Sequence, residues 1–272
     1  AVGKLPKAIN YGAFLGHSAI RMYIMGDRAL YENGSEEDLQ RMGGLVADAL
    51  HAGAFGFSTS RSSTHVTPDG TPVASRIADW SEIEYLVDVM ARHNRGIFQI
   101  APDVESGEAH EAFFARLKEI SVNSARPTMV GVFSTRQGKD PYPWQSQVKS
   151  LDDIAVAGGR VYGQTTTKSI IAVFSLKSYL PFDNLPVWRE LRELPIVEQQ
   201  KRFGDPDIRR ALIAHEAEMK PRDDIVQGGG AATTDPRRPD YDNLFALKGV
   251  DWDDPSLEEL AQQKNQHPVE VM

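Results

Sequence analysis

The sequence predicts an α/β fold in which strands and helices alternate as in a TIM (β/α)8 barrel. Two observations predict it. Short apolar segments, typical of buried parallel strands, recur roughly every 30–40 residues, and a segment of helical spacing follows most of them. We count five such strands rather than eight, so we expect a partial barrel.

The five expected strands are residues 7–15, 54–59, 96–100, 127–133 and 160–165. Helices are expected between them. Ser35, followed by three acidic residues, is typical of a capped helix start, and that helix closes near Gly53. Ser81 and Glu84 have the spacing of a capping box for the next helix. Further helices are expected at 107–121 and 145–157.

The character of the sequence changes after residue 166. Short helical segments with proline-rich joints follow, expected at 181–184, 187–194, 207–219 and 257–264. We therefore divide the chain into residues 1–166, the central βα units of a barrel, and residues 167–272, a helical and loop-rich insertion or tail that precedes a missing last strand.

The composition limits the classes of function. The chain has 272 residues, 41% hydrophobic and 25% charged, with a net charge of −8. This is enough chain for a full core. The sequence has no basic stripe of the kind that binds the phosphates of nucleic acids, so nucleic-acid binding is not expected. The absence of cysteine excludes disulfides and a cysteine nucleophile within this chain. No apolar run is long enough to span a bilayer, and we expect a cytoplasmic protein.

Two segments carry a family resemblance. The sequence NYGAFLGHSAIR at 10–21 and the sequence AGAFGFSTSR at 52–61 resemble two elements of the N-acyl-D-amino-acid deacylases, also called D-aminoacylases, of the amidohydrolase superfamily. A helix of matching length joins them. The resemblance implies a metal-dependent amidohydrolase barrel that hydrolyses N-acyl-D-amino acids, with a divalent metal, usually zinc, and a late catalytic aspartate.

The chain departs from that family where the metal ligands are expected. It contains no His-x-His pair, and the strands at 96–100 and 127–133 do not end in histidine. We assign no metal ligand in this chain. We expect it to be the central piece of a longer enzyme, whose remaining segments supply the ligands. The alternative is a protein that has lost its metal site.

The candidate site residues lie at or near predicted strand ends. Asp103 is the candidate catalytic residue, as a surrogate ligand or base, although Pro102-Asp103 is also an ordinary turn signal. No base lies at short spacing from Ser58, Thr59 or Ser60, which disfavours a serine triad. The candidate substrate-binding residues are His17, Arg21, Ser58, Arg61, His65, Gln99 and Gln164.

Each of these residues also has a structural interpretation. His17 either lines the barrel mouth or bridges two loops as a buried histidine. Arg21 either pairs with a substrate carboxylate or locks a loop through a salt bridge. Ser58 either donates to a substrate or satisfies backbone groups at the strand end. His65, as a lone loop histidine, is more often solvated than functional.

The expected function is hydrolysis of the amide bond of N-acyl-D-amino acids or related linear amides, with a small-molecule substrate as the partner. The first alternative is an amidohydrolase that acts on another substrate class, such as a cyclic amide. The second is a barrel that binds a ligand without catalysis, because the histidines of the family are missing.

Overall fold

The computed structural model describes residues 6, 8, 11–62, 65–67, 70–102, 108–131, 144–165, 167, 173–177, 180, 183, 185–217, 241–247 and 254–272. The chain forms two compact units, with the division between Ile170 and Ile171. Our interpretation of the second unit as an insertion before a last strand stays a prediction. No helix among the described residues is both long and apolar enough to cross a membrane.

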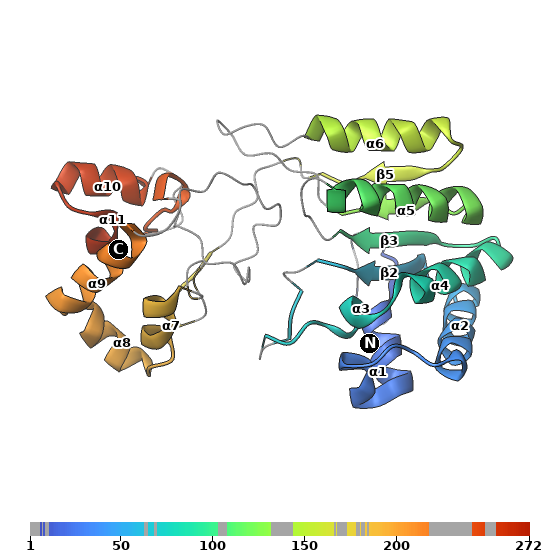
Figure 1. The fold of residues 1–272 in the computed structure, drawn as a ribbon, viewed down its shortest axis with the longest axis horizontal. Helices are drawn as coiled ribbons and strands as arrows, with labels where there is room; N and C mark the ends of the chain where they lie inside the picture. Colours follow the sequence, from blue (N-terminus) through green and yellow to red (C-terminus); the bar gives the residue numbers. More distant parts are fainter. Residues whose placement is uncertain are drawn as a thin grey trace. The chain divides into compact units, whose positions relative to one another are not determined.

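The first unit is built on a parallel sheet of five strands in the spatial order β1-β2-β3-β4-β5 (Figure 1). The strands are β1 (Phe14–Gly16), β2 (Gly56–Ser60), β3 (Ile97–Ala101), β4 (Thr128–Val130) and β5 (Val161–Gly163). A doubly wound sheet reverses its strand order at one point, whereas here every strand pairs with the next one along the chain. The sequential order confirms the predicted α/β class and is that of consecutive βα units of a barrel.

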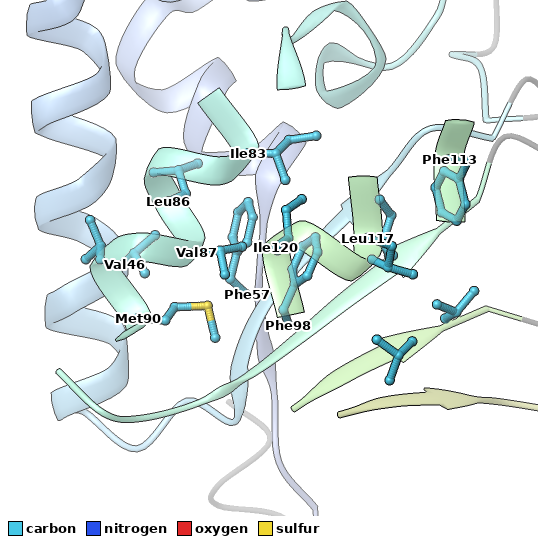
Figure 2. Packing of buried hydrophobic residues seen from close by; sticks show 14 of the residues in the cluster. Val46, Phe57, Ile83, Leu86, Val87, Met90, Phe98, Phe113, Leu117 and Ile120 are labelled. Carbon is cyan, nitrogen blue, oxygen red and sulfur yellow. The ribbon is translucent and has the colours of Figure 1, made fainter. Parts of the chain in front are cut away.

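The helices of this unit pack on one face of the sheet. They are α1 (His17–Met25), η2 (Gly26–Leu30), α2 (Glu36–His51), α3 (Ala74–Ile77), α4 (Trp80–Arg92), α5 (Glu108–Ser124) and α6 (Trp144–Val156). Right-handed crossovers between neighbouring parallel strands place every connecting helix on the same side. Figure 2 shows the resulting core, in which Val46 of α2, Met90 of α4 and Leu117 of α5 pack toward Phe57 and Phe98.

The register of the strands separates two kinds of side chain. Phe57 pairs with Phe98, and both are fully buried with stacked rings 6.0 Å apart. Ser58 pairs with Gln99, and both are half-buried. Because successive residues of a strand point to opposite faces, Ser58 and Gln99 lie on the face opposite the helices. That face lines the inside of a barrel.

Gly56 permits the close pairing at the start of β2. A Cβ atom placed on Gly56 would lie 1.8 Å from the carbonyl oxygen of Ile97, which is far inside any real contact. Only glycine fits this approach of β2 to β3.

The expected elements agree with the structure except near the first strand and at the start of α4. The first strand is short, and α1 begins at His17, where no helix was predicted. The predicted cap at Ser35 is confirmed, and the structure adds a capping box in which Asp38 is its partner. The capping box at Ser81 and Glu84 is wrong, because α4 begins at Trp80 after an N-cap at Asp79.

The second unit is helical in its described part. Its elements are α7 (Pro186–Arg192), α8 (Ile196–Phe203), α9 (Pro206–Ala217), η3 (Tyr241–Asn243), α10 (Leu257–Lys264) and α11 (Pro268–Val271). Leu185, Trp188, Leu212 and Leu257 belong to its own apolar core. Helices α8 and α11 were not predicted, and most of the helix expected at 181–184 lies outside the described residues.

Candidate functional site

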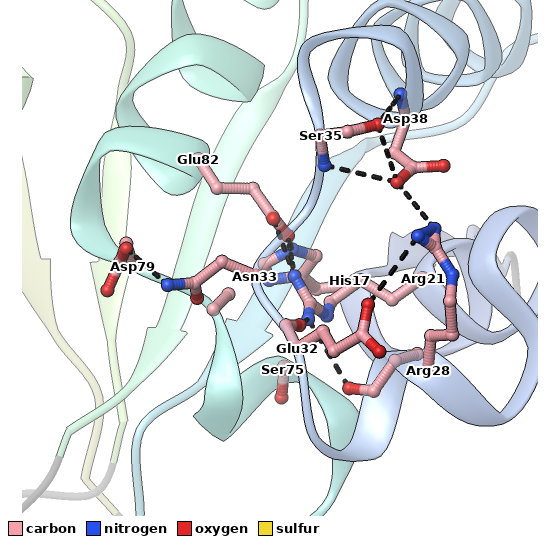
Figure 3. A network of polar contacts seen from close by, with 12 residues as sticks. His17, Arg21, Arg28, Glu32, Asn33, Ser35, Asp38, Ser75, Asp79 and Glu82 are labelled. Atoms are coloured by element: carbon pink, nitrogen blue, oxygen red, sulfur yellow. Dashed lines mark hydrogen bonds and ion pairs between the residues drawn. The ribbon is translucent and has the colours of Figure 1, made fainter.

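Two polar groups lie at the carboxyl ends of β1 and β2. The first is a buried network of His17, Arg21 and Glu82 (Figure 3), which Thr59 joins through His17. The second is the loop that follows β2, which carries Ser60, Arg61 and His65. In parallel sheets, binding and catalytic groups gather at this edge, so we compare both groups with the predicted site.

The buried network begins with the two residues of α1 that follow β1. His17 is the first residue of α1, and Arg21 lies one turn later on the same face. His17 Nδ1 lies 2.8 Å from Thr59 Oγ1, and Nε2 lies 2.6 Å from Glu82 Oε1. Arg21 Nη1 donates to both carboxylate oxygens of Glu82, at 2.6 and 2.5 Å. The network therefore joins α1, β2 and α4.

The network excludes solvent. The exposed fractions of His17, Arg21 and Glu82 are 1%, 0% and 3%. Arg21 also donates through Nη2 to the backbone oxygen of Glu32, at 2.6 Å. A charge in such a place is tolerated only when it is paired and hydrogen-bonded, and here the guanidinium and the carboxylate neutralise each other.

Burial and pairing set the protonation states. Burial lowers the pKa of His17 below its usual value, although the hydrogen bond and charge of Glu82 act in the opposite direction. Burial alone would raise the pKa of Glu82, but the hydrogen bonds from His17 and Arg21 outweigh it and hold the pKa below the usual value. Glu82 is thus a carboxylate, and neutral His17 donates to it from Nε2–H and accepts from the Thr59 hydroxyl at Nδ1.

This geometry favours the structural interpretation of His17 and Arg21. Thr59 is buried on the helix side of β2, because it alternates with the half-buried Ser58 and Ser60. His17 and Arg21 meet this side of the sheet. They do not share a face with Ser58 and Gln99, and a substrate role for them stays an untested prediction.

The loop after β2 is held at both ends. Arg61 Nη1 donates to the backbone oxygen of Ala78 at 2.6 Å and to that of Arg76 at 3.2 Å. The Arg61 guanidinium also stacks over the ring of Trp80, 5.6 Å from its centroid. Arg61 therefore ties the beginning of the loop to its end, beside the start of α4.

Within this loop the structure brings together two residues that sequence reasoning kept apart. Ser60 Oγ lies 2.6 Å from His65 Nδ1, and His65 is exposed. The sequence analysis found no base at short spacing from the serines of β2, and this was wrong. The separation of five residues does not by itself predict a contact between Ser60 and His65. The contact depends on the folded structure at the end of β2.

The other predicted residues are placed as follows. Ser58 and Gln99 are register neighbours on the open face. Gln164 follows β5, and its backbone N–H donates to Val130 at 3.0 Å. Asp103 lies outside the described residues. The structure thus groups Ser58 with Gln99 and His65 with Ser60.

Glu82 is the polar residue that sequence reasoning missed. It lies one turn before Leu86 and two turns before Met90, on the buried face of α4. An acidic residue on an apolar helical stripe signals a buried charge pair. That signal was present, but the capping interpretation of Ser81 and Glu84 concealed it.

The residues at the described strand ends do not fit a divalent metal. Across the described part of the chain, no three histidine, aspartate or glutamate side chains are grouped so that they could hold one. Serine, glutamine, arginine and glycine predominate instead, and these are poor ligands for zinc. A zinc site would have to be completed by residues other than these.

Comparison with known proteins supports the predicted resemblance. No protein-family model matches the chain. An N-acyl-D-glutamate deacylase of Alcaligenes xylosoxydans xylosoxydans is 30% identical over 146 residues, which cover 54% of this chain and 27% of that protein. An uncharacterised protein of Mycobacterium tuberculosis is 34% identical over 122 residues, 42% of this chain and 20% of that protein. The chain thus spans about a fifth to a quarter of these relatives.

Two similar solved structures carry related names. One is an N-acyl-D-glutamate deacylase of Bordetella bronchiseptica, described with zinc and a phosphonate inhibitor. It is 22% identical with a TM-score of 0.47 and covers 59% of this chain and 31% of that one. The other is a D-aminoacylase described with a binuclear metal centre, 23% identical with a TM-score of 0.48, over 60% of this chain and 31% of that one. Over about half of its length, this chain resembles the N-acyl-D-amino-acid deacylases in sequence.

Proposed function

We propose that this chain is part of a metal-dependent amidohydrolase that hydrolyses the amide bond of N-acyl-D-amino acids or related linear amides. The observation that carries the proposal is the 30% identity to an N-acyl-D-glutamate deacylase over 146 residues. The parallel sheet in sequential strand order supports it, because that is the scaffold of a barrel hydrolase.

In this proposal the chain supplies part of the substrate site. Ser58 and Gln99 lie side by side on the face of the sheet opposite the helices, where they offer a hydroxyl and an amide to a polar substrate. The loop after β2 adds His65 and Arg61 at the same edge. An amide substrate with a free carboxylate would be held by such neutral donors together with a cation.

The metal belongs to other parts of the complete protein. The described strand ends do not fit a metal site, so we derive no catalytic step through the metal from this chain. The role of Asp103 as a base stays part of the proposal, because its position is not described.

The second candidate function is ligand binding without hydrolysis. It is favoured by the strand ends themselves, since β3 and β4 are followed by Pro102 and Gly131, which offer no side-chain donor for a metal or a proton. A barrel with Ser58, Gln99 and Gln164 on its strands would still bind a small polar molecule.

The test uses the complete protein, meaning the whole reading frame that encodes this chain. N-acetyl-D-glutamate is assayed for release of acetate, with N-acetyl-L-glutamate as the stereochemical control and a hydantoin as the cyclic amide. The metal content is measured on the same sample. Hydrolysis of the D-compound with a stoichiometric divalent metal supports the proposal.

The other outcomes separate the alternatives. Hydrolysis of the hydantoin alone supports the cyclic-amide enzyme. Loss of activity on chelation and its return with zinc would assign the metal a role in the reaction. Absence of both metal and hydrolysis would contradict the proposal and leave ligand binding.

A further inference from the structure

Ser60 and His65 form a hydrogen-bonded pair at the carboxyl end of β2. Ser60 Oγ lies 2.6 Å from His65 Nδ1. The backbone N–H of Ser62 donates to the same Oγ at 3.2 Å. When His65 carries its proton on Nε2, Ser60 donates to the unprotonated Nδ1. A hydroxyl that donates to an imidazole nitrogen at this distance is the arrangement of a nucleophile with its base.

The fold holds the two residues in this arrangement through one short segment. The backbone oxygen of Ser60 accepts from the hydroxyl of Ser75 at 3.2 Å. The backbone oxygen of His65 accepts from Val73 N–H and from Arg76 Nη1, both at 3.3 Å. Val73 precedes α3, and Ser75 and Arg76 lie in it. The same segment therefore sets the positions of both members of the pair.

The pair is accessible from solvent. Ser60 is half-buried on the open face of the sheet, and His65 is exposed. This distinguishes it from the buried network next to it, where His17 also contacts a hydroxyl but has an exposed fraction of 1%.

We propose that Ser60 and His65 are a nucleophile and a general base that react with activated carboxylic esters. Ser60 Oγ forms a bond to the carbonyl carbon while its proton passes to His65 Nδ1. The bond to the alcohol breaks, and the leaving alcohol takes that proton. Water then cleaves the acyl-serine and restores the hydroxyl. The reaction requires no metal and is separate from the proposed amide hydrolysis.

The proposed site consists of a nucleophile and a base only, and this determines the turnover rate that we expect. Among the residues that the structure describes, no carboxylate contacts the His65 imidazole in the way that the third member of a complete triad does. General-base assistance alone contributes roughly 100- to 10,000-fold. We therefore expect clear covalent labelling and slow turnover.

The experiment is covalent labelling of the complete protein with an alkyl fluorophosphonate. Ser60 Oγ forms a bond to phosphorus, fluoride leaves, and His65 takes the proton. Intact mass and peptide mapping are expected to show one adduct on Ser60. The Ser60→Ala variant should lose it, and His65→Ala should label about 100-fold more slowly. The matched controls are Ser81→Ala and His93→Ala, which alter exposed residues elsewhere on α4 and its C-cap.

Two further measurements test whether the labelling depends on the folded Ser60–His65 pair and is independent of a metal. Protein unfolded in urea should not be labelled, because the pair exists only in the folded loop. A metal chelator should leave the labelling unchanged, even if it abolishes amide hydrolysis. Three results would overturn the proposal. The wild-type protein could remain unlabelled, the adduct could lie on another residue, or a folded His65→Ala variant could be labelled at the wild-type rate.

Discussion

His17 and His65 follow neighbouring strands of one sheet, yet they have opposite environments. His17 comes directly after β1 and turns into the helix layer, where it has an exposed fraction of 1% and contacts Thr59 and Glu82. His65 lies on the loop after β2, is exposed and contacts Ser60. Each imidazole binds one hydroxyl of β2. Those hydroxyls belong to adjacent residues, Thr59 and Ser60, which point to opposite faces of the sheet.

The difference shows that the face toward which a side chain points, rather than its position at a strand end, decides what it can do. The network on the helix side contains a paired charge and is almost fully buried, so it contributes to stability and positions the first turns of α1 and α4. The pair on the open side contributes few contacts, and in our proposal it supplies a nucleophilic oxygen. We therefore expect substitutions in the first group to change stability, and substitutions in the second to change chemistry.

The largest effect is expected from Glu82→Ala. This change leaves the Arg21 guanidinium buried without its carboxylate and removes the acceptor of His17. Loss of one partner of a buried ion pair costs about 3–5 kcal/mol. Hydrogen exchange of the α1 and α4 amides in the complete protein measures this locally, which is appropriate because the chain has two units.

The matched control is Glu84→Ala on the same helix. Glu84 pairs with Arg116 at 3.2 Å, but both side chains are more than 40% exposed. Exposed pairs contribute about 0–1 kcal/mol. Equal destabilisation by the two variants would contradict the distinct role of the buried network.

A smaller effect is expected from Thr59→Val. The change keeps the shape of the side chain but removes the hydroxyl that donates to His17 Nδ1. A buried acceptor left without its donor costs about 1–3 kcal/mol. The same hydrogen-exchange measurement checks it. Unchanged protection of α1 in the Thr59→Val variant would contradict a contribution of this hydrogen bond to stability.

The buried His17 should make the stability of the first unit depend on pH. Burial lowers the pKa of His17 in the folded protein, against an opposing contribution from Glu82 and with smaller ones from Arg21 and Arg61. As the pH falls below about 6.5, the unfolded chain binds a proton that the folded chain resists. Stability therefore decreases toward acid, by at most about 1.4 kcal/mol per pH unit.

The measurement is the unfolding free energy of the α1 region between pH 7 and 5.5. A His17→Gln variant should show a weaker slope over this window, because it has no imidazole to titrate. The lowered pKa of Glu82 adds a further loss only at lower pH, below its ordinary carboxyl range. A wild-type stability that rises toward acid would contradict the assignment of a neutral His17.

The local pattern of the sequence was sufficient for most elements of the first unit. Helices α2, α4, α5 and α6 and all five strands were predicted, because apolar periodicity is a local property. Helix α1 was not predicted. Its N-cap, Gly16, provides no side-chain hydrogen bond, and the helix is stabilised by tertiary packing of Ile20, Met25 and Arg21. Propensity alone carries no signal for such a helix.

The candidate site was less predictable for a related reason. His17 contacts residues 42 and 65 positions away, so its direction depends on the folded sheet and not on its neighbours in sequence. The Ser60–His65 pair is local, but it depends on the loop being held by the segment around α3. The ends of β1, β2 and β3 were located within one residue, whereas β4 and β5 end earlier than predicted. Which side chains meet there was a property of the tertiary structure.

The smallest effect on stability is expected from Ser60→Ala and His65→Ala. These variants test most directly whether the Ser60–His65 pair differs from the buried network of His17. His65 is exposed and Ser60 is half-buried, and substitutions away from the core usually change stability by less than about 0.5 kcal/mol. Both variants should therefore retain the hydrogen-exchange protection of α1 and α4, although Ser60→Ala loses the labelling and His65→Ala labels about 100-fold more slowly. Arg61, Ser75 and Arg76 hold the loop through backbone oxygens, and Ser60 Oγ adds a single backbone contact, which it accepts from the Ser62 N–H. Destabilisation as large as that of Thr59→Val would instead make Ser60 and His65 structural residues, like their neighbours on the other face of β2.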